Sequence, residues 1–317
     1  MVVTVVLYKR FAAGLAVWFL IGAGLMGCTN GGSSANGSAS LRGINPNAEL
    51  DYENARVHLP SDYVTTRDHI YELSLIDSAA EGAVIKCARE EAGLDLKGYP
   101  IDKDEPTRYV FWKYGPWTEA VAEKFAFVPP MTDGELVANG LVPQSVDPVE
   151  SPNLNPYADL SEADRQKIRD ACASDPDAQK FDIYKAQSDG PGEVELQDAW
   201  IQVDSDARMK ALVEELDACF RTRGMEVDPG RIGYPKSAEP NVINEDQIAM
   251  ALKTVECKDK VDFTQRAVDI LAEHQMDVID EHADELFAAR QEWDDLVADA
   301  KQYIEENPDV FVQPDAN

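Results

Sequence analysis

The sequence has few basic residues. Its 317 residues include 29 lysines and arginines against 59 aspartates and glutamates, which gives a net charge of -30 at pH 7. A surface with this excess of negative charge repels phosphate, so it argues against nucleic acid binding and against adhesion to anionic lipid headgroups. It is compatible with divalent cations, with basic partners and with simple solubility, and it does not by itself identify a cation site.

The sequence also lacks the short motifs of common catalytic sites. Neither a Gly-x-Ser-x-Gly elbow nor a P-loop is present. The Asp175-x-Asp177 and Asp204-x-Asp206 pairs lack the glycine and the distal glutamate of a calcium loop. Carboxylates are so numerous that two catalytic acids would not stand out among them. We therefore predict no catalytic residue and no cofactor, and an envelope hydrolase remains only as an alternative.

Histidine is scarce, with four residues in the chain. His274 and His282 lie eight positions apart, two turns along nearly the same face of a predicted helix. Asp277, Asp280 and Glu281 lie between them, so together these residues are candidates for a metal site. The His-x-x-x-His spacing that allows adjacent turns to share one zinc ion is absent. A solvated acidic helix with incidental histidines is the simpler interpretation, and we predict no metal site.

The N-terminal residues of the sequence form a distinctive pattern of charged, apolar and small side chains before a cysteine. Lys9 and Arg10 precede an uncharged run of 16 residues, 11–26, which leads into Gly27-Cys28. The run is shorter than the roughly 20 residues that a membrane-spanning helix needs. A charged start, a short apolar core and a small residue before a cysteine resemble a bacterial lipoprotein signal peptide. We predict that residues 1–27 are removed and that Cys28 carries the acyl chains, palmitate among them, that anchor the protein to the extracytoplasmic face of the cell membrane.

The rest of the chain divides by composition. Residues 28–50 are predicted to form the lipidated cysteine and a flexible tether, because residues 29–40 are rich in Gly, Ser and Asn and contain no apolar side chain larger than alanine. Residues 51–306 are predicted to form the ectodomain, with a division into halves 60–175 and 176–306 as one option. Residues 307–317 are predicted to form a C-terminal tail.

Apolar residues recur at helical spacing through most of the ectodomain. Thr65 with Asp68 indicates a helix start, and steps of three and four then continue toward a helix end near Gly93. Further helix starts are predicted at Ser161, at Asp204 or Ser205, and at Asn244.

The longest regular stretch runs from Val261 to Glu306 and predicts one helix of about 45 residues, which Asn307-Pro308 ends. Alternating strand patterns are few and no β-α-β rhythm is present. We therefore predict a mostly α fold: a disulfide-stapled helical ectodomain with a long C-terminal helix, behind a signal peptide and a flexible tether.

The cysteines predict two disulfides. With Cys28 assigned to lipid, the remaining four are even in number and none lies in a Cys-x-x-Cys motif. Four cysteines allow three pairings. Cys87 and Cys219 each stand at a helix end, and each is followed by a proline-bearing loop and a capped helix that ends in a cysteine. This internal parallel favours the pairs Cys87–Cys172 and Cys219–Cys257.

Three short motifs occur in order along the chain: Tyr114-Gly115-Pro116-Trp117, then Cys219-x-x-x-x-Gly224, then a helix with Glu245 and Ala249 that leads to Cys257. Together with the long acidic helix that follows, they resemble a group of uncharacterised actinobacterial lipoproteins and secreted proteins. The resemblance covers residues 73–286 and implies architecture and an extracytoplasmic location. It implies no activity and transfers no site residue.

An aromatic cluster is the candidate binding surface. Trp and Tyr side chains give large contact areas at low entropy cost and stack on sugars or on partner side chains. The alternative is that the cluster forms part of the core beneath the proline-rich segment 129–156. Its members are Tyr109, Phe111, Trp112, Tyr114 and Trp117.

These features predict a cell-envelope lipoprotein with a non-catalytic binding or scaffolding role. Its partners would be the membrane, reached through the lipid on Cys28, and an unidentified protein or envelope component. The alternative is a solute- or cation-binding lipoprotein that serves an importer, although the chain lacks the two-lobed α/β rhythm of most such proteins.

Overall fold

The computed structural model describes residues 43–66, 69–101, 110–142, 155–183 and 190–312. The predicted signal peptide, the predicted lipidation site Cys28, most of the predicted tether, Tyr109 and the end of the predicted tail lie outside these residues. Within them the chain is mostly helical, as predicted, with ten α-helices and a few short strands. No helix in this part of the chain has the length and apolar character needed to cross a lipid bilayer.

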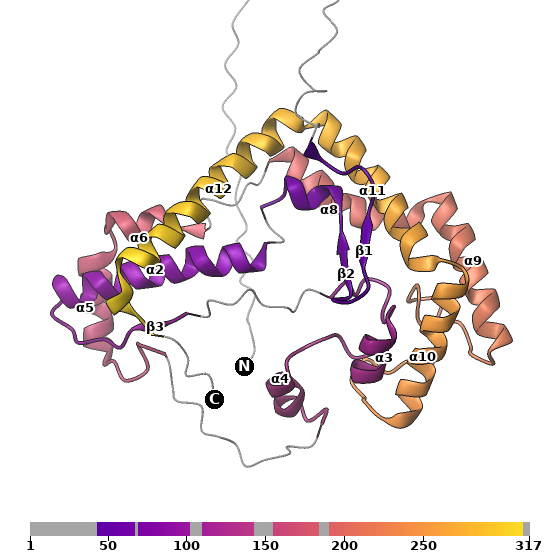
Figure 1. Ribbon diagram of the computed structural model, residues 1–317. Helices are drawn as coiled ribbons and strands as arrows, with labels where there is room; N and C mark the ends of the chain where they lie inside the picture. The colour runs from indigo at the N-terminus through magenta and orange to yellow at the C-terminus, as the bar shows by residue number, and fades with distance from the viewer. Residues whose placement is uncertain (1–42, 67–68, 102–109, 143–154, 184–189, 313–317) are drawn as a thin grey trace, which may run out of the picture. The chain divides into compact units, whose positions relative to one another are not determined.

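The helices follow one another along the described chain with short connecting elements (Figure 1). The first are β1 (Glu49–Asp51), β2 (Arg56–His58), the 3₁₀ helix η2 (Pro60–Tyr63), α2 (Ile70–Glu90), β3 (Tyr99–Pro100), α3 (Glu119–Phe125), α4 (Asp133–Ala138), α5 (Glu162–Cys172) and α6 (Pro176–Lys180). The others are α8 (Pro191–Gln202), η3 (Val203–Ser205), α9 (Ala207–Thr222), α10 (Glu245–Lys260), α11 (Phe263–Glu281), α12 (Ala283–Glu306), η4 (Pro308–Val310) and β4 (Phe311–Val312).

Capping side chains fix several of the predicted helix starts. Ser161 accepts a hydrogen bond from the backbone N–H of Asp164 at the start of α5, and Asn244 accepts one from Gln247 at the start of α10. Asp206 caps α9, next to the positions predicted for it. Each cap satisfies a backbone donor that the helix itself leaves unpaired, so the local sequence is enough to place these starts.

The start of α2 differs from the prediction. The helix begins at Ile70, after His69, and not at the Thr65 cap. The backbone N–H of Thr66 and the hydroxyl of Thr65 instead donate to the carboxylate of Glu193, at 3.0 Å and 3.1 Å. The Thr65 and Thr66 donors therefore make a tertiary contact ahead of the helix.

The predicted 45-residue helix is divided in two. It ends as α11 at Glu281 and begins again as α12 at Ala283, with His282 (φ -112°, ψ 20°) outside the helical region, and Figure 1 shows the change of direction. The start of α8 lies against this bend, since a Cβ on Gly192 would come within 2.8 Å of His282 Cβ. Because α8 packs on α11 while α2 packs on α12, a straight helix would lose one of these partners.

Two hydrophobic clusters form most of the interior. The largest brings together α3, α9, α10 and α11 with the segment that leads into β1 and β2. The second lies between α2, α6 and α12. Its largest members are Ile76, Phe181, Trp293 and Tyr303.

The strands are short, and they form two separate pairs. β1 pairs with β2 in an antiparallel register that sets Leu50 opposite Val57. β3 pairs with β4 in parallel, with Tyr99 opposite Phe311. The second pair holds the Phe311 ring against α2, where a Cβ on Gly82 would come within 2.3 Å of that ring. Strands of two or three residues show no alternating pattern, so the sequence does not predict them.

The structure pairs Cys87, Cys172, Cys219 and Cys257 as the internal parallel favours. The sulfur atoms of Cys87 and Cys172 are 2.08 Å apart, and those of Cys219 and Cys257 are 2.01 Å apart. The first bridge joins the last turns of α2 and α5, and the second joins α9 to α10. All four side chains are buried.

Candidate functional site

The predicted aromatic surface lies mainly in the core. Phe111, Tyr114 and Trp117 are buried in the largest hydrophobic cluster, and Trp112 is partly buried against it, while Tyr109 falls outside the described residues. Trp117 Nε1 donates to the Phe111 carbonyl at 3.0 Å, and the Tyr114 hydroxyl donates to a carboxylate of η3 at 2.9 Å. Because these polar tips have partners inside the protein, the three buried residues form a core element and not a binding surface.

A lysine that the sequence analysis did not select lies beneath this aromatic segment. Lys258 on α10 is 1% exposed, and its Nζ donates to the backbone carbonyls of Tyr114 and of Pro116, the latter at 2.8 Å. Burial lowers the pKa of Lys258 to about 7, and the carboxylate of Asp259 opposes this effect. Ala251, two turns earlier, is also buried on α10. Helical periodicity therefore places position 258 on the buried face, and this was the feature of the sequence that could have identified Lys258. Lys258 holds the aromatic turn onto α10.

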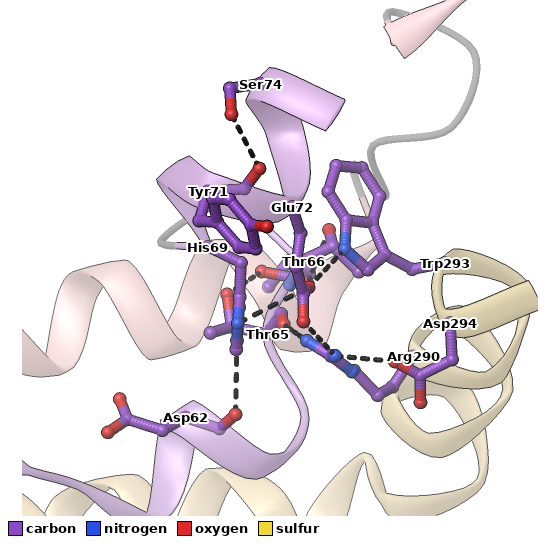
Figure 2. A network of polar contacts seen from close by, with 11 residues as sticks. Asp62, Thr65, Thr66, His69, Tyr71, Glu72, Ser74, Arg290, Trp293 and Asp294 are labelled. Atoms are coloured by element: carbon purple, nitrogen blue, oxygen red, sulfur yellow. Dashed lines mark hydrogen bonds and ion pairs between the residues drawn. The ribbon is translucent and has the colours of Figure 1, made fainter. Parts of the chain in front are cut away.

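A polar network joins the start of α2 to α12 (Figure 2). Glu72 accepts hydrogen bonds from Arg290 Nη2 at 2.9 Å and from Trp293 Nε1 at 2.7 Å. Arg290 also donates to the Thr65 carbonyl at 3.3 Å, and His69 Nδ1 lies 3.4 Å from the carboxylate of Glu72. Burial opposes the ionisation of Glu72, but the hydrogen bonds from Arg290 and Trp293, together with the charges of His69 and Arg290, hold the pKa below its usual value. The network therefore fixes a charged contact between two helices that are distant in the sequence.

Replacing Glu72 with glutamine is expected to lower the free energy of unfolding by about 1–3 kcal/mol at neutral pH, because Arg290 loses one of its two carboxylate partners and keeps only Asp294 on its own helix. The folded-state pKa of Glu72 lies below its ordinary value of 4.5, so this stabilisation is present above that pH and is lost as the pH falls through the folded pKa. Urea denaturation at neutral and at acidic pH measures both effects. Glu292→Gln, at an exposed position on α12, is the control. Equal stabilities of wild type and Glu72→Gln at neutral pH would contradict the prediction.

A fully buried carboxylate, Glu193, extends the polar contacts to α8. Glu193 is 1% exposed and is the acceptor for the Thr65 and Thr66 donors described above. It stands in the first turn of α8, where the backbone N–H groups of a helix favour negative charge. Its neighbours along the first turns, Gly192 and Glu195, face the bend between α11 and α12.

Three carboxylates surround the imidazole at that bend. His282 Nε2 lies 3.4 Å from Glu195 Oε1, and Nδ1 lies 3.6 Å from Glu285 Oε2. One possible donor atom from each of Glu195, Glu281 and His282 lies within 4.8 Å of the other two. The Nε2 atom is buried and has no hydrogen-bond partner. We call Glu195, Glu281, His282 and Glu285 the His282 centre.

The backbone of α8 positions one member of this centre. Glu285 Oε1 accepts a hydrogen bond from the N–H of Gly192 at 3.3 Å, and its other oxygen faces His282. In many metal sites one imidazole nitrogen donates a hydrogen bond to a carboxylate while the other nitrogen binds the metal. Glu285 places a carboxylate on the Nδ1 side of His282, at a distance longer than a hydrogen bond. Among the described residues, no lysine or arginine forms an ion pair with Glu195 or Glu281. The negative charge of the centre is therefore open to neutralisation by a cation.

The structure separates the two histidines that the sequence places on one helical face. His274 Nε2 lies 3.2 Å from the capping aspartate of α9, whereas His282 faces α8. Asp277 and Asp280 are exposed and take no part in the His282 centre. Sequence reasoning missed Glu195 because it lies on a different helix, which only the folded chain brings to the bend.

Comparison of the chain with protein-family models, with curated proteins and with solved structures gave no significant match. The resemblance to actinobacterial lipoproteins therefore stays a prediction from the sequence. The function of the chain has to be inferred from its own residues.

Proposed function

We propose that this chain is a lipid-anchored protein of the cell envelope with a binding role, and that it binds a divalent transition-metal ion at the His282 centre. The pattern that ends in Cys28 supports the location, and the two disulfides are typical of an oxidising compartment. The observation that carries the binding role is the buried Nε2 of His282, which lacks a hydrogen-bond partner and faces the carboxylate of Glu195.

The distances in the centre are close to those of a metal site. Zinc ligands at about 2.0–2.1 Å in tetrahedral geometry lie about 3.3 Å from one another. The separation of His282 Nε2 and Glu195 Oε1 is 3.4 Å, and Glu281 has a donor atom within 4.8 Å of both residues. The proposal requires a rotation of the exposed Glu281 side chain that brings its oxygen to ligand distance. The chain would then supply one nitrogen and two oxygen ligands, with Glu285 orienting the imidazole.

The ligand set favours a particular class of ion. Calcium and magnesium take oxygen ligands, whereas an imidazole suits zinc, iron, nickel and copper. Two carboxylates beside one imidazole therefore favour a borderline ion of the zinc type over calcium or magnesium. Selectivity for such an ion separates this proposal from a general attraction of cations to an acidic surface, which follows charge and not ligand type.

Titration of the full-length chain in detergent with zinc chloride is expected to show one binding event that calcium and magnesium do not reproduce. Glu281→Gln removes a ligand, and Glu285→Gln is expected to weaken zinc binding by about tenfold because the imidazole loses its orienting partner. Asp280→Asn removes an equal charge one residue away and is the matched control. Isothermal titration calorimetry measures the affinities. Equal zinc affinities of wild type, Glu281→Gln and Glu285→Gln would overturn the metal site and leave a scaffolding role as the proposal.

The anchor has a separate test. Cells that express the full chain in the presence of radiolabelled palmitate are expected to incorporate the label into the protein, and the labelled protein is expected to enter the detergent phase on Triton X-114 partition, because two acyl chains give stable membrane attachment. The Cys28→Ser variant is expected to lose the label. Labelling of Cys28→Ser to the wild-type level would contradict the lipid anchor and would leave the His282 centre untouched.

A further inference from the structure

A polar pocket lies between α2, α6 and α12, away from the His282 centre. Its volume is about 440 Å³, which is within the range of pockets that hold small molecules. The residues that define it here are Lys86, Asp177, Lys180, Asp299, Tyr303 and Glu306, and we call it the Tyr303 pocket.

The phenol group after which the pocket is named has no partner in the protein. Tyr303 is 8% exposed, and its hydroxyl is buried without a hydrogen bond. A buried hydroxyl left unpaired costs roughly 1–3 kcal/mol, so most such groups in folded proteins have a partner. Burial raises the pKa of Tyr303, and the carboxylates of Asp177 and Asp175 add to this effect, so the hydroxyl stays protonated at neutral pH. It keeps a donor proton that no group of the described chain accepts.

Only some of the charged side chains that line the pocket form ion pairs with one another. Lys180 forms an ion pair with Asp299 at 2.8 Å. Lys86 is partly buried, and its Nζ donates to the side-chain carbonyl of Asn307 at 3.0 Å, but it forms no ion pair with a carboxylate among the described residues. Asp177 likewise has no ion pair with a lysine or arginine in the described chain. In a protein with twice as many acidic as basic residues, a partly buried ammonium group without a carboxylate is unusual.

From this arrangement we infer that the Tyr303 pocket binds a small zwitterion of the amino-acid or short-peptide type. The ligand carboxylate pairs with the ammonium group of Lys86 and accepts a hydrogen bond from the Tyr303 hydroxyl, and the ligand ammonium group pairs with Asp177. Lys86 and Asp177, which form no ion pair in the described chain, and the unpaired Tyr303 hydroxyl then each have a complement on the ligand. A ligand with only one of the two charges leaves either Lys86 or Asp177 without a partner.

The test is thermal unfolding of the full-length chain in detergent with glycine, L-alanine, L-glutamine and L-alanyl-L-alanine. Ligand in about a hundredfold excess over its Kd raises the unfolding midpoint by several degrees. The N-acetyl and the amide derivatives of the best probe each lack one charge and are expected to bind at least about tenfold more weakly. A neutral sugar, glucose, is expected to have no effect. A flat response to all four zwitterions, or a response to glucose alone, would overturn the assignment.

Two variants connect the response to this pocket. Tyr303→Phe removes one hydroxyl and is expected to weaken binding about five- to tenfold, and Lys86→Met is expected to weaken it at least about tenfold. Lys301→Met, an exposed lysine on α12, changes the net charge equally and is expected to bind as the wild type does. Unchanged affinity in both Tyr303→Phe and Lys86→Met would place the zwitterion elsewhere and overturn the inference.

Discussion

Loss of the Cys87–Cys172 disulfide is expected to lower the free energy of unfolding by about 4–5 kcal/mol. The two cysteines are 85 positions apart, and in the chain-entropy model a cross-link over a loop of that length removes a large part of the conformational entropy of the unfolded chain. The Cys219–Cys257 bridge closes 38 positions and is expected to contribute about 4 kcal/mol. Since folded domains are stable by only about 5–15 kcal/mol, either loss should be obvious.

Denaturant unfolding of the double variants Cys87→Ala/Cys172→Ala and Cys219→Ala/Cys257→Ala measures the two effects. Alanine is the appropriate replacement because all four side chains are buried and leave little room for a polar group. Wild type unfolded in the presence of a reductant is the control, since it loses both bridges without any change of side chain. A loss of less than about 1 kcal/mol in either variant would contradict the entropic account of the bridges.

The stability of the wild type relative to Lys258→Met is expected to rise by about 1.4 kcal/mol per pH unit above pH 7. Burial lowers the pKa of Lys258 from its ordinary value of 10.5 to about 7 in the folded protein. Between these two values the unfolded chain binds one more proton than the folded chain, so a rise in pH favours the folded state. Below the folded pKa both states are protonated and the difference no longer changes with pH.

Paired denaturation curves of wild type and Lys258→Met from neutral pH to moderately alkaline pH test this expectation. The comparison with the variant cancels the contributions of other groups, including the buried tyrosines. Lys253→Met, at an exposed position on the same helix, is expected to show no such slope. A difference that is flat with pH would show that the carbonyls of Tyr114 and Pro116 keep the ammonium form of Lys258 inside the fold, because hydrogen bonds to a charged group favour that form.

The part of the fold that sequence could predict is the part set by neighbouring residues. Ser161 and Asn244 fix helix starts because a cap and its backbone donor are three positions apart. The cysteine pairs follow from a parallel between two segments of the chain. Thr65 shows the limit of this reasoning, since the helix begins only at Ile70 and the Thr65 hydroxyl binds Glu193, 128 positions away.

The candidate sites were less predictable because their geometry is tertiary. His282 looks like one more position on a continuous helix until Gly192 allows α8 to approach it and the helix bends. Periodicity reports which residues share a face, and it says nothing of which other helix lies opposite. The same limit applies to the aromatic segment: its composition is equally typical of an interface and of a core, and only the internal partners of Tyr114 and Trp117 decide between them.

The contact between α2 and α12 can form only late in folding, after the C-terminal helix has been synthesised. Glu72 and Trp293 are 221 positions apart, so α2 is synthesised long before the helix on which it packs. At about 5–20 residues per second, the ribosome needs about 10–45 s to make the chain between them. During that interval Leu75, Ile76 and Ala79 have no α12 to cover them, although the α5 partner that Cys87 requires is already made. Once the chain reaches an oxidising compartment, the Cys87–Cys172 bridge can form before α12 packs, and it then holds the last turn of α2 beside α5.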